Sequence, residues 1–116
     1  MVFTNKKTIL IVAGEESGDL HGSSLVGEML QRMPELSFFG IGGDRLQDGG
    51  VETIEHTDNM AVMGFSGVVS KYRFLRKVFQ NIVKEIDRRN PERAILIDYP
   101  GFNLRLAKKL KERGVP

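Results

Sequence analysis

Short, continuous apolar runs alternate along the chain with longer stretches in which apolar residues recur at helical spacing. The continuous runs predict strands that are buried on both faces of a parallel sheet; they span residues 8–13, 37–41 and 94–97. The periodic stretches predict amphipathic helices; they span residues 19–34, 68–89 and 102–113. Strands that alternate with helices predict an α/β fold with a Rossmann-like, doubly wound parallel sheet.

Capping and breaking residues set the expected limits of these elements. Asp19 is the expected N-cap of the first helix, and Pro34 ends that helix. The long helix either runs unbroken or breaks near Tyr72. The segment before it is less regular, with one helical turn expected at 44–47, a short extended piece at 51–54 and a loop at 58–67.

Helical periodicity also selects the side chains that are expected to face the core. In the first helix these are Leu20, Leu25, Val26, Met29, Leu30 and Met33. In the later helices they are Val78, Ile82, Val83, Ile86, Leu104, Leu106 and Leu110. The chain stops at Gly114-Val115-Pro116, where a further strand is expected to begin. We therefore interpret residues 1–116 as one incomplete domain at the start of a longer protein.

The amino-acid composition excludes several kinds of functional site. The 116 residues include no cysteine, which excludes disulfides and thiolate chemistry, and the two histidines lack the paired spacing of a zinc site. No metal site and no cofactor are therefore expected. No apolar run is long enough for a signal-peptide core or a membrane span, which favours a cytoplasmic location.

Charge is distributed unevenly, with a formal net charge of −6 over residues 1–58 and +8 over residues 59–116. Such asymmetry favours an anionic partner for the second half, or else simply solvated helix faces. Cations at 71, 73, 76 and 77 interleave with the apolar residues Phe65, Val68, Val69, Tyr72 and Leu75. This pattern suits a helix on an anionic membrane surface, and equally a core helix with one wet face. No nucleic-acid recognition module is present, so nucleic acid is not expected as a partner.

Two polar segments directly follow predicted strands, and they contain the candidate binding and catalytic residues. The loop 14–19 lacks both the dinucleotide and the Walker A glycine spacing, and its carboxylates suit sugar hydroxyls or an amine better than phosphate. It is otherwise a plain turn capped by Ser17 or Asp19. Asp98 ends the third run, where partial burial would make it a general base; the alternative is a turn residue. His21 is either an acid–base group beside Asp19 or, more commonly at such a position, structural.

Four segments occur in a distinctive order and spacing across essentially the whole chain. They are Val12-Ala13-Gly14-Glu15 with Ser17-Gly18-Asp19-Leu20-His21-Gly22, then Gly40-Ile41-Gly42-Gly43, Met60-Ala61-Val62-Met63-Gly64, and Ile97-Asp98-Tyr99-Pro100-Gly101-Phe102-Asn103. Together they resemble the lipid-A-disaccharide synthases, glycosyltransferases of lipid A and lipopolysaccharide biosynthesis. The resemblance implies a GT-B enzyme with two Rossmann-like domains. Residues 1–116 would form the acceptor-side domain, and the C-terminal, donor-binding domain is absent from this chain.

The resemblance also implies a reaction and a set of roles. The enzyme would join UDP-2,3-diacylglucosamine to 2,3-diacylglucosamine 1-phosphate, releasing UDP, as a cytoplasmic protein peripheral to the inner face of a Gram-negative inner membrane. Asp98 would be the base that activates the acceptor 6-hydroxyl. The substrate-binding residues would be Glu15, Ser17, Gly18, Asp19, Met63 and Asn103. The membrane-contacting residues would be Phe65, Val68, Val69, Tyr72 and Leu75.

The match has two departures, and two other functions remain open. Glu16 stands where a small residue is usual, and Gly101 stands where many members carry a second aspartate, which leaves Asp98 as the main candidate base. The first alternative function is a non-catalytic module that binds membrane or lipid. The second is a nucleotide-binding domain of another kind, against which the missing phosphate-loop spacing argues.

Overall fold

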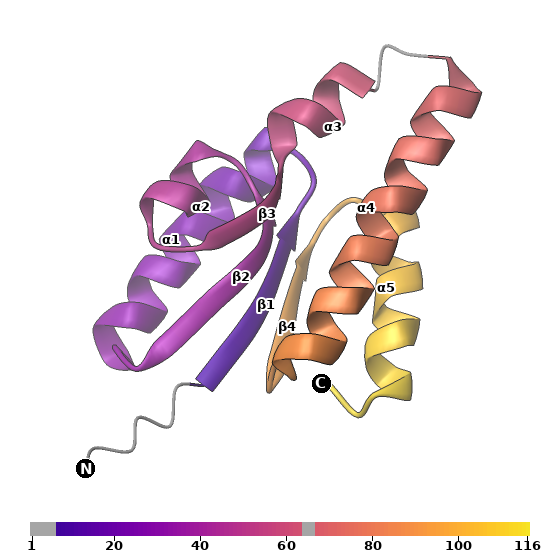
Figure 1. The fold of residues 1–116 in the computed structure, drawn as a ribbon. Helices are drawn as coiled ribbons and strands as arrows, with labels where there is room; N and C mark the ends of the chain where they lie inside the picture. The colour runs from indigo at the N-terminus through magenta and orange to yellow at the C-terminus, as the bar shows by residue number, and fades with distance from the viewer. Residues whose placement is uncertain (1–6, 64–66) are drawn as a thin grey trace.

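The computed structural model describes residues 7–63 and 67–116, so that Phe65 lies outside the described residues. Nine helices and strands alternate along these residues (Figure 1). The strands are β1 (Lys7–Ala13), β2 (Leu36–Gly42), β3 (Glu52–His56) and β4 (Arg93–Ile97). The helices are α1 (Glu16–Arg32), α2 (Asp44–Asp48), α3 (Thr57–Met63), α4 (Val68–Arg89) and α5 (Pro100–Glu112).

The four strands form one parallel sheet in the order β3-β2-β1-β4. The predicted α/β fold with a parallel sheet is therefore confirmed, and the extended piece expected at 51–54 is its edge strand β3. The carboxyl ends of all four strands lie along one edge, at the top of Figure 1. At the other end of β4, the Ala94 amide donates a hydrogen bond to the Pro116 carbonyl at 2.9 Å.

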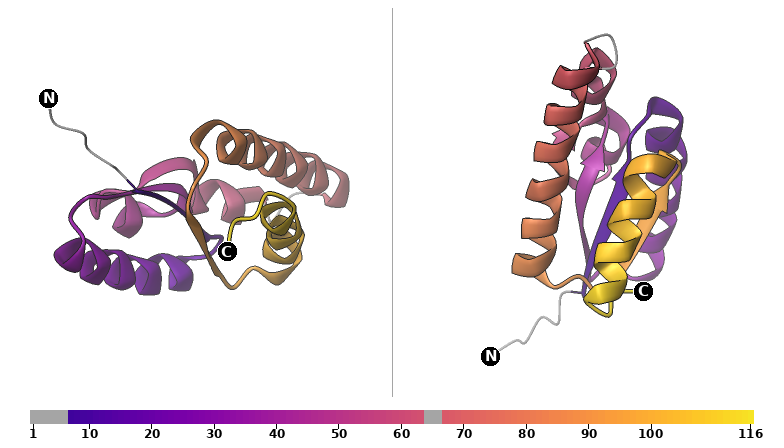
Figure 2. Two further views of the ribbon diagram at one scale, coloured as in Figure 1. Left: turned by 90° about the horizontal axis from the view of Figure 1, so that it is seen from below. Right: turned by 90° about the vertical axis from the view of Figure 1, so that its right-hand side faces the viewer.

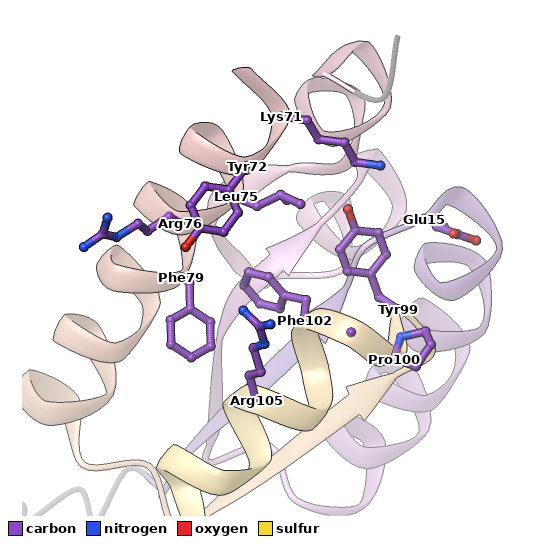
Figure 3. A pocket seen from close by; sticks show the side chains of 11 residues that line it. Glu15, Lys71, Tyr72, Leu75, Arg76, Phe79, Tyr99, Pro100, Phe102 and Arg105 are labelled. Atoms are coloured by element: carbon purple, nitrogen blue, oxygen red, sulfur yellow. The ribbon is translucent and has the colours of Figure 1, made fainter. Parts of the chain in front are cut away.

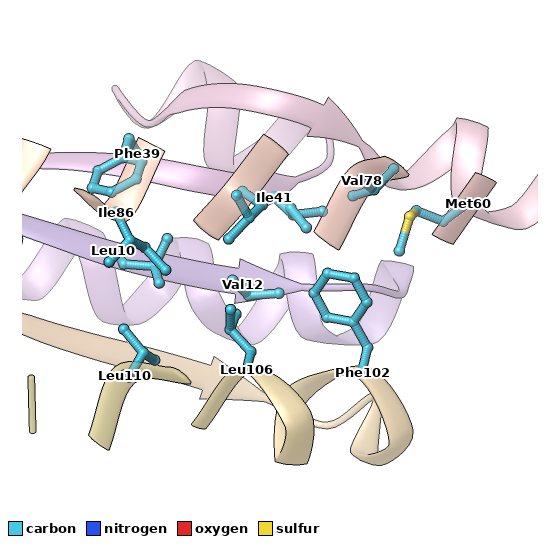
Figure 4. Packing of buried hydrophobic residues seen from close by; sticks show 11 residues of the cluster. Leu10, Val12, Phe39, Ile41, Met60, Val78, Ile86, Phe102, Leu106 and Leu110 are labelled. Carbon is cyan, nitrogen blue, oxygen red and sulfur yellow. The ribbon is translucent and has the colours of Figure 1, made fainter. Parts of the chain in front are cut away.

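Helices cover both faces of the sheet, α1 and α2 on one and α4 and α5 on the other (Figures 1 and 2). Alternation along β1 explains this, because successive side chains of a strand point to opposite faces. Leu10 and Val12 join the cluster built with α4 and α5 (Figure 4), whereas Ile9 and Ile11 join the cluster beneath α1. Both clusters consist of apolar side chains, so the sheet centre has the continuous apolar pattern of a buried parallel strand.

Half of the apolar stripe expected for α1 faces the core. Val26 is buried, and Met29 and Leu30 pack against the cluster beneath the helix, as expected. Leu20, Leu25 and Met33 are exposed instead, which corrects the other half. The buried Gly22 completes the contact face, because a Cβ added there would lie 3.1 Å from Ile97 Cδ1, tighter than an ordinary contact.

Three further expectations concern the other helices. The segment expected as a loop at 58–67 contains α3, which follows β3 without an intervening residue. Helix α4 runs unbroken through Tyr72, and of its expected core residues Val78, Ile82 and Ile86 are buried and Val83 is half-buried. In α5 Leu106 and Leu110 are buried as expected, but Leu104 is 72% exposed.

Candidate functional site

The loops and first helical turns that follow the carboxyl ends of β1 and β4 hold most of the predicted site residues at one edge of the sheet. Glu15 and Ser17 follow β1, and Asp98 follows β4, the strand that pairs with β1. Both Glu15 and Ser17 are exposed. In open α/β sheets this edge is where ligands bind. The topology therefore brings the two polar segments found in the sequence to neighbouring positions.

The turn between β4 and α5 is conformationally unusual. Asp98 and Tyr99 are consecutive non-glycine residues in the left-handed region, with φ of 50° and 51°. Such residues each cost about 1–3 kcal/mol and persist where the surroundings enforce them, often at functional sites. Asp98 is exposed, which corrects the expected partial burial. The turn thus presents a carboxylate to solvent at the ligand-binding edge.

Two contacts hold this turn. The Asn103 side chain, in the first turn of α5, donates from Nδ2 to the Asp98 carbonyl at 2.6 Å. Asn103 is 5% exposed, and its buried Oδ1 has no hydrogen-bond partner within the described ranges. The Tyr99 ring covers Gly14, where an added Cβ would lie 2.5 Å from the ring. Partial burial and the nearby Glu15 carboxylate raise the pKa of Tyr99.

Asp19 ties the first helix to the neighbouring loop. Its buried carboxylate accepts backbone hydrogen bonds from Gly43 at 2.7 Å, Leu46 at 3.0 Å and Arg45 at 3.1 Å. It therefore caps the start of α2, and the expectation that it caps α1 was wrong, because α1 begins at Glu16. Three amide donors stabilise the charged carboxylate in its buried position. No local pattern in the sequence links Asp19 to a partner 24 residues away.

His56, for which the sequence offered no context, also lies at this edge. Its Nδ1 accepts from the Asp58 amide at 3.0 Å, so the proton resides on Nε2, which donates to Asp44 at 2.8 Å. His56 thereby joins the starts of α2 and α3. His21 is exposed, and no hydrogen bond joins it to Asp19, whose oxygens face α2.

The other predicted residues are placed as follows. Gly18 is buried against Ala13 and Ile97, and Met63 is half-buried at the end of α3. Glu16 and Gly101, the two departures from the family pattern, are both exposed. Nothing lies within 4 Å of a Cβ added at Gly101, so the structure leaves room there for a side chain.

A groove of about 520 Å³ opens between α4 and α5 beside the Asp98–Tyr99 turn (Figure 3). Periodicity did not reveal it, because its two walls come from two different helices, which are separated by ten residues (90–99) that include β4. Its lining comprises Glu15, Lys71, Tyr72, Leu75, Arg76, Phe79, Tyr99, Pro100, Gly101, Phe102 and Arg105. Phe79 and Phe102 meet edge to face at its base, with ring centroids 5.4 Å apart.

The predicted membrane-contact residues divide into two groups. Val68 and Val69 are 85% and 64% exposed, on the part of α4 that rises above the sheet (Figure 1). Leu75 instead packs against the core cluster and lines the groove. Tyr72 is exposed and also lines the groove. No helix within residues 7–63 and 67–116 is long and apolar enough to cross a membrane. In the same residues no cluster of three or more His, Asp or Glu side chains is arranged to hold a metal ion.

Comparison with known proteins gives one consistent family. The family profile described as Lipid-A-disaccharide synthetase matches residues 9–116. The chain is 48% identical to the lipid-A-disaccharide synthase of Syntrophus aciditrophicus over 112 residues, which are 97% of the chain and 29% of that protein. It is 45% identical to that of Myxococcus xanthus over 113 residues, 97% of the chain and 30% of the relative.

The chain thus spans about 30% of the length of these relatives. Both the profile and the relatives cover nearly all of the chain, including the β1–α1 loop and the Asp98–Tyr99 turn. The resemblance inferred from the four sequence segments is confirmed at this level, and the chain belongs to the lipid-A-disaccharide synthase family.

Proposed function

We propose that the full-length protein containing this chain transfers a diacylglucosamine unit from UDP to 2,3-diacylglucosamine 1-phosphate. Residues 1–116 would form its acceptor-side domain, and a second Rossmann-like domain would bind the donor. The observation that carries the proposal is the exposed Asp98 carboxylate, held on a strained turn at the carboxyl edge of a sheet whose sequence belongs to this family. The groove beside the turn gives an acylated acceptor somewhere to lie.

In the proposed reaction Asp98 accepts the proton of the acceptor 6-hydroxyl. The hydroxyl oxygen forms a bond to the anomeric carbon of the donor while the bond from that carbon to the UDP oxygen breaks. A base positioned in this way contributes about 10²–10⁴-fold to the rate. Asn103 acts through the Asp98 carbonyl, and Tyr99 acts by fixing the turn against Gly14. Both are positioning residues, because neither contact requires substrate.

Of the remaining predicted residues, some would contact the acceptor directly and others would shape the loops around it. Glu15 and Ser17 are exposed at the edge and would accept or donate hydrogen bonds to sugar hydroxyls. Gly18 and Asp19 are buried, so they would act by shaping the loops, Gly18 through close packing and Asp19 through the backbone of α2. Met63 would lie at the α3 side of the acceptor site.

We also propose that this enzyme works at the inner face of the inner membrane, with α4 in contact with anionic lipid. Val68 and Val69 would enter the acyl boundary, and Lys71 and Arg73 would meet headgroups. The support is their exposure on one projecting half-helix. The same exposure favours the second candidate, a lipid-binding module without catalysis.

UDP release by the full-length protein separates these two candidates. The protein is incubated with both substrates, and donor alone serves as the control for hydrolysis. The glycosyl-transfer proposal predicts UDP release that requires the acceptor and is matched by disaccharide formation. A folded protein that binds vesicles and releases no UDP would contradict that proposal and support the lipid-binding module.

A further inference from the structure

The chemistry of the α4–α5 groove is that of a site for an amphiphile. Its base is apolar, formed by Leu75, Phe79 and Phe102, and its volume of about 520 Å³ falls in the usual range for small-molecule sites. Phe79 and Leu75 are only half-buried, so part of this apolar surface faces the open groove. An acyl chain would cover it and remove it from water.

The rim of the groove carries three cationic side chains that form no ion pair with the described residues. Lys71, Arg76 and Arg105 line it, and none of them has an ion-pair or hydrogen-bond partner among the described residues. One carboxylate, Glu15, joins them at the Tyr99 end (Figure 3). In Figure 3 Arg105 lies beside Phe102, so a cation borders the apolar base directly. An anionic head attached to a chain on that base would meet it.

We propose that this groove binds an acyl chain of a phosphate-bearing molecule, with the phosphate held by Arg76 and Arg105. The occupant is the acylated sugar phosphate that serves as acceptor, and in this respect the inference rests on the proposed function. Guanidinium groups suit phosphate because they donate paired hydrogen bonds at a fixed geometry. With the chain in the groove, the sugar lies toward Tyr99 and Glu15, beside the Asp98 turn.

Calorimetric titration of the chain with alkyl phosphates below their micellar concentration tests the site without any turnover. Dodecyl phosphate binds saturably at one site, and each methylene added between decyl and dodecyl phosphate raises the affinity about fourfold. Inorganic phosphate alone gives no measurable heat. The absence of saturable binding, or an affinity that does not depend on chain length, would overturn the proposal.

Paired variants locate the phosphate. Arg76→Gln with Arg105→Gln weakens dodecyl phosphate binding at least about tenfold. Lys84→Gln with Lys108→Gln removes the same charge from the same two helices, outside the groove lining, and leaves affinity within about twofold. All four side chains are exposed, and none forms an ion pair with another described residue, so both variants are expected to fold. If both double variants lose the same affinity for dodecyl phosphate, the effect reflects the net charge of the protein alone, and the proposed phosphate site is wrong.

Competition experiments show whether the acyl chain that occupies the groove belongs to the acceptor or to a membrane lipid. 2,3-Diacylglucosamine 1-phosphate displaces dodecyl phosphate, whereas a short-chain phosphatidic acid, which is also a phosphate monoester and so matches its charge, displaces it at least about tenfold less well. Equal displacement would assign the groove to membrane lipid and contradict the acceptor. Asp98→Asn leaves the affinity for dodecyl phosphate unchanged, because this probe has no sugar hydroxyl for Asp98 to contact and Asp98 is not part of the groove lining. A failure of the proposed base is thereby distinguished from a failure of the groove.

Discussion

The two halves of α4 both contain apolar residues and cations, but they lie in different environments. In the half from 78 to 89, Val78, Ile82 and Ile86 are buried against the sheet. In the half from 68 to 77, Val68, Val69 and Tyr72 are exposed. Both halves mix apolar residues with cations, so the apolar content alone does not distinguish them, although acidic residues occur only in the second half. What distinguishes them is that the sheet lies beneath one half and ends below the other (Figure 1).

The cations follow the same division. Arg88 and Arg89 pair with Glu85, Arg89 also pairs with Glu52, and its guanidinium lies 4.8 Å from the centre of the Phe39 ring. In the other half no acidic partner faces Lys71 or Arg76 within the part of the chain that the structure describes. One half of the helix therefore completes the fold, and the other half presents apolar and cationic groups that the fold itself does not use.

The largest effect expected from this division is on stability. Ile82→Ala removes a fully buried side chain from the core cluster and lowers the free energy of unfolding by about 2–5 kcal/mol. Val69→Ala, at a 64% exposed position of the same helix, changes it by less than about 0.5 kcal/mol. Urea unfolding followed by circular dichroism measures both. Similar losses in the two variants would contradict the division.

The exposed half is expected to dominate association with membranes. Val68→Ser with Val69→Ser lowers partitioning onto phosphatidylglycerol vesicles about tenfold or more, because both side chains lose apolar area that the bilayer would cover. Leu104→Ser is the matched control, since Leu104 is equally exposed but lies on α5. Co-sedimentation at low and high salt measures partitioning. If Leu104→Ser lowers vesicle partitioning by as much, the membrane-binding surface is not confined to α4.

The smallest expected effect concerns the ion pairs formed by residues 78–89, the half of α4 that packs on the sheet. Hydrogen bonds from Arg88 and Arg89 lower the pKa of Glu85, and that from Arg113 lowers the pKa of Asp87. A carboxyl with a lowered folded-state pKa stabilises the protein above its ordinary pKa and loses that contribution as pH falls through the folded value. Stability therefore decreases as the pH drops below about 4, where carboxylates of this kind titrate.

Glu85→Gln with Asp87→Asn flattens that decrease, and Arg76→Gln in the unpaired half leaves it as it was. Unfolding midpoints measured in urea between pH 6 and pH 3 give the comparison. An unaltered slope in the double variant would show that these exposed pairs contribute nothing measurable, as is common for surface pairs.

The sheet could be predicted from the sequence because its signal is local. The continuous apolar runs at β1, β2 and β4 report burial on both faces, and a carboxylate directly after a run must lie at the carboxyl edge. The position of Asp98 followed from this reasoning alone. Its exposure did not, since that depends on the left-handed turn that Asn103 and Tyr99 hold in place.

The errors arose where tertiary contacts override local preference. Leu20 and Leu25 have helical spacing, but the face of α1 that meets the sheet is completed by Gly18 and Gly22, and the two leucines are exposed. Asp19 has the chemistry of an N-cap, and it caps α2, which is remote in sequence. The groove depends on α4 and α5 meeting in space. Periodicity within one helix carries no information about such a pairing.

The most direct test of the central claim, that Asp98 is the base of an acceptor-side domain, is kcat/KM of the full-length protein carrying Asp98→Asn. The matched control is Asp48→Asn, which neutralises an exposed carboxylate on α2 that pairs with no cation in residues 7–63 and 67–116. The account predicts a loss of about 10²–10⁴-fold for Asp98→Asn, with unchanged unfolding, and near-normal turnover for the control. Turnover of the Asp98→Asn protein within a few-fold of the parent would contradict it.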